Sequence, residues 1–163
     1  MSKNIKSKAI IYYSLEGNID YISKTIGQKI DADIYKIKLE NPLNSDRFSK
    51  YLIGGFQSMF NIKPNIINAE IDLSSYDVIF IGTPVWAGRH APAINTFLSS
   101  KKIKDKDIVL FCSYKGDKGK VFEKLEENLY GNNIISKMEF KEPIKEEETD
   151  TKITEWINEL SIK

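Results

Sequence analysis

The fold is decided by the stretch VIFIGTPVWAG at residues 78–88. Its first four residues form an uninterrupted apolar run, which is typical of a strand buried on both faces of a parallel sheet. The Thr-Pro step then predicts a turn, because Pro84 keeps the preceding residue out of the helical region and Gly88 tolerates unusual backbone conformations. Open α/β sheets bind ligands just past the carboxyl ends of their strands. Trp86 is therefore expected to be exposed on a ligand-binding loop, with a cap on the core as the alternative role.

Strand and helix patterns alternate along the rest of the chain. The apolar periodicity predicts strands over residues 8–13, 32–39, 77–82, 107–112 and 134–140, and helices over 18–30, 91–100, 118–130 and 149–160. The last helix is expected to be capped by Thr149. Such alternation predicts a parallel sheet with helices on both of its faces.

A single α/β domain over residues 1–163 accounts for this pattern. We expect a three-layer α/β/α sandwich with a five-stranded parallel sheet in the order 2-1-3-4-5. Because this order reverses direction between strands one and three, the ligand crevice should lie above strands one, three and four.

The stretch 41–70 is too long for a simple connection, and we expect it to be an insertion between strands two and three. Several of its apolar residues recur at near-helical spacing: Phe48, Tyr51, Leu52, Ile53, Phe56, Met59 and Phe60. Most of them are expected to pack on the sheet, and one or two could reach a ligand at the rim of the crevice.

Composition excludes several classes of function. The 163 residues carry a formal net charge of +1, which gives no reason to expect nucleic acid or an anionic membrane as a partner. The single cysteine, Cys112, excludes an internal disulfide and is expected to be a small buried residue. Neither a signal peptide nor a membrane span is recognisable, so a cytoplasmic protein is expected.

The first predicted loop covers residues 14–19, between the first strand and the helix that follows. A turn with Gly17 at a helix start presents unpaired backbone N–H groups and the positive end of the helix dipole, which suit a phosphate group. Ser14 and Asn18 can add side-chain donors, and simple capping of the helix is the alternative. The glycine patterns of dinucleotide-binding and nucleotide triphosphatase loops are absent here.

The second and third predicted loops, residues 83–88 and 113–117, share one design. Each follows a buried strand and contains an aromatic residue and then a glycine. The two aromatic side chains, Trp86 and Tyr114, could bracket a flat heterocycle whose phosphate lies at the first loop. A flavin mononucleotide (FMN) has this geometry.

These motifs resemble the flavodoxin family, and the likeness spans nearly the whole chain. YYSLEGN at 12–18 resembles the family's phosphate loop, and GTPVWAG at 82–88 followed by APAI at 91–94 resembles its first flavin loop and the next helix. LIGGF at 52–56 is similar to an insertion in many bacterial flavodoxin-like proteins. The resemblance implies a flavodoxin-like fold, non-covalent FMN and redox chemistry at its isoalloxazine ring.

The resemblance also implies which residues bind the cofactor. They are Ser14, Leu15, Glu16, Gly17, Asn18 and Ile19 at the phosphate, Thr83, Pro84, Val85, Trp86, Ala87 and Gly88 at the ring and ribitol, and Ser113, Tyr114, Gly116 and Asp117 at the pyrimidine side. A carbonyl of Ala87 or Gly88 is the candidate that turns toward the reduced flavin N5. Ile19 replaces a threonine that is usual in the family, so Ile19→Thr is expected to restore a donor. Glu16 would repel a phosphate and is expected to face solvent or to cap the helix.

An FMN-binding electron carrier that serves redox partner proteins is the expected function, because no catalytic residue or metal-ligand cluster is recognisable. The alternative is an FMN-dependent NAD(P)H oxidoreductase that acts on a quinone or another small acceptor. A flavin-free interaction module on the same fold is a third reading. Arg89 and His90 are expected to point into solvent, and tuning of the flavin potential is their alternative role.

Overall fold

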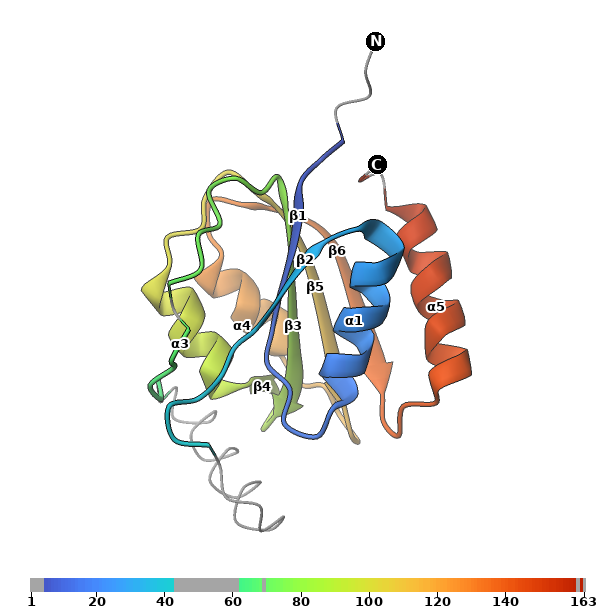
Figure 1. Cartoon of the computed structure of the whole chain (residues 1–163). Coiled ribbons are helices and arrows are strands. Elements are labelled where there is room, and N and C mark those ends of the chain that lie inside the picture. The colour runs from blue at the N-terminus through green and yellow to red at the C-terminus, as the bar shows by residue number, and fades with distance from the viewer. Residues whose placement is uncertain (1–4, 43–61, 69, 161, 163) are drawn as a thin grey trace.

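The computed structural model of the chain describes residues 5–42, 62–68, 70–160 and 162 (Figure 1). The elements follow in the order β1 (Lys8–Tyr12), α1 (Asn18–Ile30), β2 (Asp33–Lys36), β3 (Val78–Trp86), β4 (Arg89–His90), α3 (Pro92–Ser100), β5 (Asp107–Tyr114), α4 (Val121–Asn128), β6 (Asn133–Lys141) and α5 (Glu146–Glu159). Parallel pairing gives the strand order β2-β1-β3-β5-β6. The flavodoxin-like strand order predicted from the sequence is thereby confirmed.

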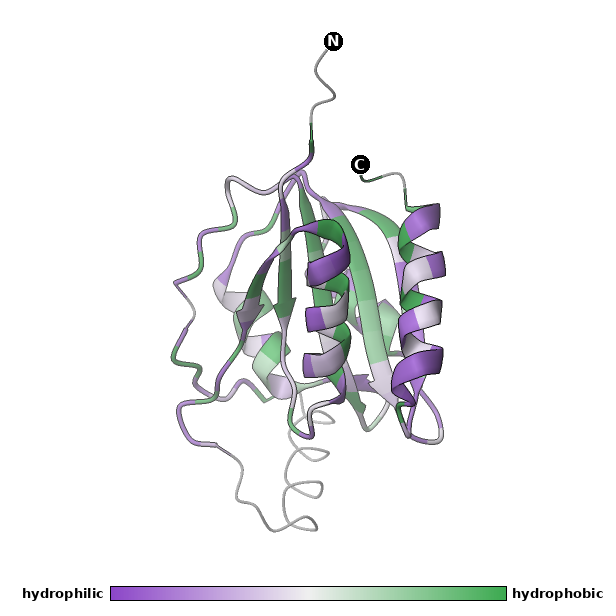
Figure 2. Cartoon of the chain, turned by 45° about the vertical axis from the view of Figure 1, so that its right-hand side comes forward, coloured by the Kyte–Doolittle hydropathy of each residue, from purple (hydrophilic) through white to green (hydrophobic). Residues whose placement is uncertain are grey.

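The central strands are apolar on both faces of the sheet. In β3, Val78 and Phe80 pack on one side while Ile79 and Ile81 pack on the other, as the period of two along a strand requires. Helices α1 and α5 cover the first side, and α3 and α4 cover the second (Figure 1). Hydrophobic residues of the helices turn toward the sheet (Figure 2). The result is the expected three-layer sandwich.

β3 extends further than expected, and the predicted turn at Pro84 is wrong. The strand continues to Trp86 and forms an antiparallel hairpin with β4, in which Trp86 lies opposite Arg89. Pro84 is tolerated because the last β1 pair is at Gly82, so β3 has lost one neighbour where the proline stands. The reversal falls on Ala87 and Gly88, whose φ angles of 50° and 71° are those of a tight two-residue hairpin turn.

α5 begins earlier than expected, so the prediction of Thr149 as its cap is also wrong. Lys145 is the N-cap residue, and Glu146, Glu147 and Glu148 form the first turn. Three carboxylates at a helix N-terminus interact favourably with the helix dipole. Thr149 is buried inside the helix instead.

Residues 38–40, just before the stretch 41–70, pair with residues 65–67 inside it. Leu39 forms an isolated antiparallel bridge with Ile66, and the Glu40 N–H donates to the Asn65 carbonyl at 2.9 Å. The apolar residues predicted to pack on the sheet, from Phe48 to Phe60, and the motif at 52–56 lie outside the described residues. An insertion within a single domain stays a prediction.

Within the described ranges, none of the helices combines the length and the apolar character needed to cross a bilayer.

Gly82 provides a test of the packing between β3 and β5. A β-carbon at this position would lie 2.3 Å from Cζ of Phe111, whose ring is fully buried. We expect Gly82→Ala to lower the free energy of unfolding by about 1–3 kcal/mol, because an overpacked core is relieved only by shifting side chains or backbone. Urea denaturation of the flavin-free protein measures this change.

Phe111→Leu supplies the matched control, because it removes the ring that the new methyl group would meet. The double variant should lose less stability than the sum of the two single variants. Additive losses would show that Phe111 is not what excludes a side chain at Gly82.

Candidate functional site

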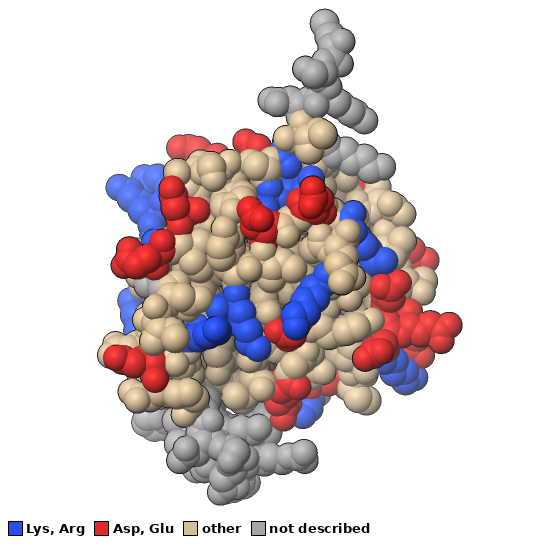
Figure 3. Space-filling view, in the orientation of Figure 1, with Lys and Arg blue, Asp and Glu red and all other residues tan. Residues whose placement is uncertain are grey.

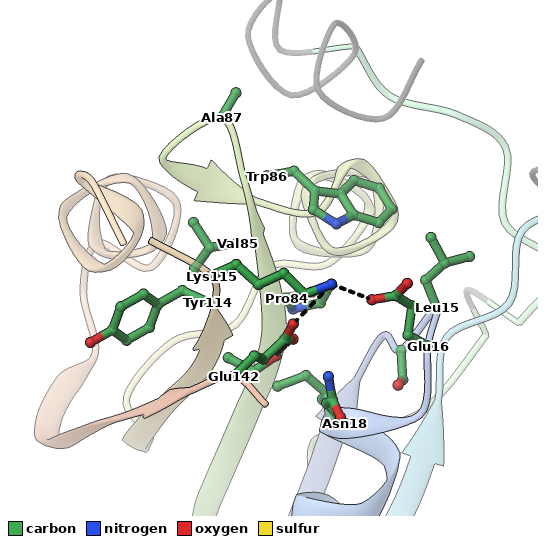
Figure 4. Close-up of a pocket in the computed structure, with 13 residues that line it drawn as sticks. Leu15, Glu16, Asn18, Pro84, Val85, Trp86, Ala87, Tyr114, Lys115 and Glu142 are labelled. Atoms are coloured by element: carbon green, nitrogen blue, oxygen red, sulfur yellow. Dashed lines mark hydrogen bonds and ion pairs between the residues drawn. The ribbon is translucent and has the colours of Figure 1, made fainter. Parts of the chain in front are cut away.

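A pocket of about 230 Å³ opens at the carboxyl edge of the sheet, above β1, β3 and β5 (Figure 4). Its walls consist of Ser14, Leu15, Glu16, Asn18, Ile19, Pro84, Val85, Trp86, Ala87, Ser113, Tyr114, Lys115 and Glu142. The three predicted loops therefore meet where the strand order reverses.

Most predicted site residues lie on this pocket, and five do not. Those five are Gly17, Thr83, Gly88, Gly116 and Asp117. Whether the lining residues bind a ligand stays a prediction.

Two pocket residues, Lys115 and Glu142, are absent from the predicted set. Lys115 stands inside the third loop between Tyr114 and Gly116, where the pattern of an aromatic residue and a glycine assigns it no role. Glu142 follows β6, whose loop carries no motif. The topology does point to Glu142, because β6 is parallel to β5 and ends at the same edge of the sheet.

The first loop leads directly into α1 and presents backbone donors. Gly17 is the N-cap residue, with a φ of 99°. Because glycine has no side chain, the N-cap residue makes no side-chain hydrogen bond to the first turn of the helix. The Gly17 N–H donates to Ser14 Oγ at 3.2 Å, so the Ser14 hydroxyl retains its own hydrogen as a donor. Asn18 lies beside the pocket on the first turn of α1 (Figure 4). A helix start of this kind is suited to an anion.

Glu16 and Ile19 occupy different environments within the same loop. Glu16 is exposed and precedes the N-cap residue of α1, and its Oε2 lies 3.4 Å from Lys115 Nζ. Ile19 adjoins the pocket floor but is fully buried in the core beneath α1. Because Ile19 also lines the pocket, the expectation that Ile19→Thr adds a phosphate donor stays a prediction.

Trp86 is half-buried rather than exposed, and it both lines the pocket and packs against the core. Its indole meets the ring of Tyr13 edge to face, with centroids 5.8 Å apart and an interplanar angle of 86°. Burial raises the pKa of Tyr13 to about 12, which keeps this phenol neutral. The contact with the core is therefore present, and a contact of Trp86 with a ligand stays a prediction.

The hairpin turn beside Trp86 is fastened to the start of α4. The Gly88 carbonyl accepts a hydrogen bond from the Lys120 N–H at 3.0 Å. Gly119 lies against the same residue, since a β-carbon on Gly119 would stand 2.5 Å from Gly88 Cα. Of the two carbonyls expected to turn toward a flavin, that of Gly88 already has a partner, and Ala87 is the remaining candidate.

Thr83 supports the pocket from below. It is fully buried, its Oγ1 accepts a hydrogen bond from the Ala91 N–H at 2.8 Å, and it donates to the Pro84 carbonyl at 2.9 Å. These bonds fix the start of α3 to the end of β3. The contribution of Thr83 to the site is therefore the placement of the second loop.

Lys115 reaches across the pocket from the third loop (Figure 4). Its Nζ lies 3.4 Å from Glu16 Oε2 and 3.5 Å from Glu142 Oε2. Glu142 is the least exposed of the three side chains, at 9%. Its Oε1 accepts a hydrogen bond from Ser113 Oγ at 3.1 Å.

His90 and Cys112 are both buried away from the pocket wall. The expectation that His90 points into solvent is wrong, because β4 folds back on β3 and packs against α4. Burial lowers the pKa of His90, and this effect outweighs the hydrogen bond to Asn95.

The prediction of a buried Cys112 is confirmed, and burial raises the pKa of its thiol to about 12. A thiol with such a pKa is a poor nucleophile at neutral pH.

A larger hollow of about 570 Å³ lies at the opposite edge of the sheet, next to residues 70–74 and 101–106. Its basic side chains are Lys101, Lys102, Lys104 and Lys106. This hollow precedes β5, at the amino edge, where open α/β sheets do not place their ligands. The smaller pocket is therefore the candidate site.

Comparison with known proteins gives a consistent picture of this architecture. A family model described as Flavodoxin matches residues 7–160. A solved structure from Bacteroides eggerthii is 23% identical, covers 97% of this chain and 99% of its own, and has a TM-score of 0.78. A flavoprotein in complex with FMN from Lactobacillus acidophilus is 27% identical, covers 93% of this chain and 99% of its own, and has a TM-score of 0.74. A search of curated proteins gave no significant match.

The buried His90 predicts a pH dependence of stability. Its pKa lies near 6.5 in the unfolded chain and below that in the folded one, so between these values only the unfolded chain binds the proton. The free energy of unfolding should therefore fall as the pH is lowered below about 6.5, by at most about 1.4 kcal/mol per pH unit from this group.

Carboxylates also titrate in acid, so the measurement compares the wild type with His90→Gln. Urea denaturation between pH 7.5 and pH 5 should give a steeper loss for the wild type. Parallel stability curves for the two proteins would contradict a depressed pKa at His90.

Proposed function

The chain belongs to the flavodoxin family, and from this premise we propose that it binds FMN non-covalently and carries electrons between redox partner proteins. The observation that carries the proposal is the pocket itself. It joins the start of α1, the indole of Trp86 and the third loop at the edge where the strand order reverses.

The residues present fit FMN. The first turn of α1 and the Ser14 hydroxyl supply donors for the phosphate. Trp86 supplies an aromatic wall, and Leu15 and Val85 add apolar surface that excludes water. The Lactobacillus acidophilus structure, which holds FMN, shares this fold over 93% of the chain.

FMN, when bound, supplies the one-electron and two-electron chemistry of the isoalloxazine ring. The chain's own residues orient and shield that ring. The Ala87 carbonyl, at the tip of the β3–β4 turn, is the acceptor that we assign to a proton on the reduced ring. The Gly88 carbonyl is held by the Lys120 N–H, and this hydrogen bond limits the movement of the turn.

A carrier is favoured over an enzyme by the groups around the pocket. The buried His90 and Cys112 are not on its walls, and the carboxylates that line it, Glu16 and Glu142, both pair with Lys115. Among the described pocket residues, these two carboxylates are the main candidates for general acid–base catalysis, and both are already engaged in ion pairs.

Partner proteins would dock over the exposed edge of the flavin. On the side of the molecule shown in Figure 3, basic and acidic side chains are intermixed.

Trp86 provides the first test of the proposal. We expect Trp86→Ala to weaken FMN binding by about 1–3 kcal/mol, because it removes buried apolar area and ring stacking. The dissociation constant is measured by titrating the flavin-free protein with FMN and following the quenching of flavin fluorescence. Unchanged affinity in a folded Trp86→Ala protein would leave Trp86 with its core role alone.

The chain has only one other tryptophan, Trp156, which offers a matched control. Trp156 lies on α5 and is buried against the sheet, where its Nε1 donates to Ser136 Oγ at 2.8 Å. Trp156→Phe should therefore leave the FMN dissociation constant unchanged. In that variant Trp86 is the sole indole, and bound FMN should quench most of the remaining tryptophan emission.

The rate at which the protein oxidises NADH or NADPH distinguishes a carrier from a reductase. The purified holoprotein should oxidise NADH or NADPH only when a flavodoxin reductase is added, since a carrier does not itself take hydride from a nicotinamide. Rapid oxidation of NADPH by the holoprotein with a quinone as the sole acceptor would replace the carrier function with the oxidoreductase function. A protein that takes up no FMN at all would exclude both and leave the interaction module.

A further inference from the structure

We infer that Lys115 is the cation that makes the pocket select a flavin with a phosphate group, by offsetting the carboxylate of Glu16. This inference rests on the proposed FMN binding and assigns a specificity-determining residue to the same site.

Lys115 lies on the far side of the pocket from the first loop. It follows β5 while Glu16 follows β1, and β3 separates these two strands in the sheet. Its side chain nevertheless spans the pocket, and its Nζ comes within 3.4 Å of Glu16 Oε2 (Figure 4). An ammonium group from the third loop is thereby placed at the first loop.

Glu16 creates the need for such a cation. It immediately precedes Gly17, the N-cap residue of α1, so it belongs to the loop whose backbone N–H groups suit a phosphate. A carboxylate and a phosphate dianion at the same helix start repel each other. Lys115 neutralises this carboxylate and can also attract the phosphate.

Glu142 anchors Lys115 over the pocket. Its side chain is only 9% exposed, and its carboxylate accepts a hydrogen bond from the Ser113 hydroxyl. The backbone of Glu142 is fixed as well, because its N–H donates to the Tyr114 carbonyl at 2.8 Å. With Nζ lying 3.5 Å from Glu142 Oε2, Lys115 is kept between two carboxylates before any ligand arrives. A phosphate that reaches the start of α1 can then share the ammonium, whereas a flavin without phosphate cannot.

The size of the effect follows from exposure. The Lys115 side chain is 63% exposed, so water and salt screen its charge, and a modest contribution is expected. We expect Lys115→Met to weaken FMN binding about two- to fivefold at low ionic strength. Riboflavin, which lacks the phosphate, should bind the variant and the wild type equally.

The experiment titrates flavin-free protein with FMN and with riboflavin at low and high salt. Lys118→Met is the matched control, because Lys118 pairs with Glu139 outside the pocket. Lys118→Met should leave both dissociation constants unchanged. The loss caused by Lys115→Met should shrink at high salt, because screening already weakens the wild-type contact.

Glu16→Gln, combined with Lys115→Met, completes a double-mutant cycle on FMN binding. This change removes the repulsive charge, so it should tighten FMN binding, and the gain should be larger in the Lys115→Met background than in the wild type. Urea denaturation of each flavin-free variant confirms that it is folded.

Three results would overturn the inference. If the wild type binds FMN and Lys115→Met binds it equally well, the proposed function stands and only the role of Lys115 falls. If Lys115→Met loses FMN and riboflavin by the same factor, Lys115 acts on the ring and not on the phosphate. If the wild type binds neither flavin, the proposed function and the inference fail together.

Discussion

Burial of both faces of the central strands is the constraint on which the rest of the structure depends. Strands such as β3, with Val78 and Phe80 on one side and Ile79 and Ile81 on the other, need helices above and below them. Because each helix must return the chain to the same end of the sheet, the strands run parallel and finish at one edge. Residues from four separate loops are therefore brought within reach of one another at that edge.

Unequal strand lengths then shape the pocket. β1 covers five residues and ends at Tyr12, whereas β3 covers nine and continues as a hairpin with β4. The part of β3 that lies beyond β1 forms one wall, and the first loop, which turns back into α1, forms another. Trp86 fills the corner between them because Tyr13 supports its ring.

The sequence was sufficient for the strand order and for the meeting of three loops, because both follow from apolar periodicity and strand direction. It was insufficient where a tertiary contact decided the outcome. Pro84 favours a turn locally but is accepted at a position where β3 has lost a neighbour. His90 is polar but becomes buried when β4 folds back, and Glu142 enters the pocket from a loop without any motif. Lys115 is recognisable as a site residue only when the span across the pocket is known.

The contact between Gly88 and Gly119 has a consequence for how this sequence can diverge. Both residues have positive φ angles, and their backbones stand so close that a side chain on Gly119 would collide with Gly88 Cα. The hairpin turn and the start of α4 are therefore not independent in evolution, although 31 positions separate them in the numbering from 88 to 119. A lineage that acquires a side chain at position 119 must also rebuild the turn, so the two loops are expected to change together or not at all.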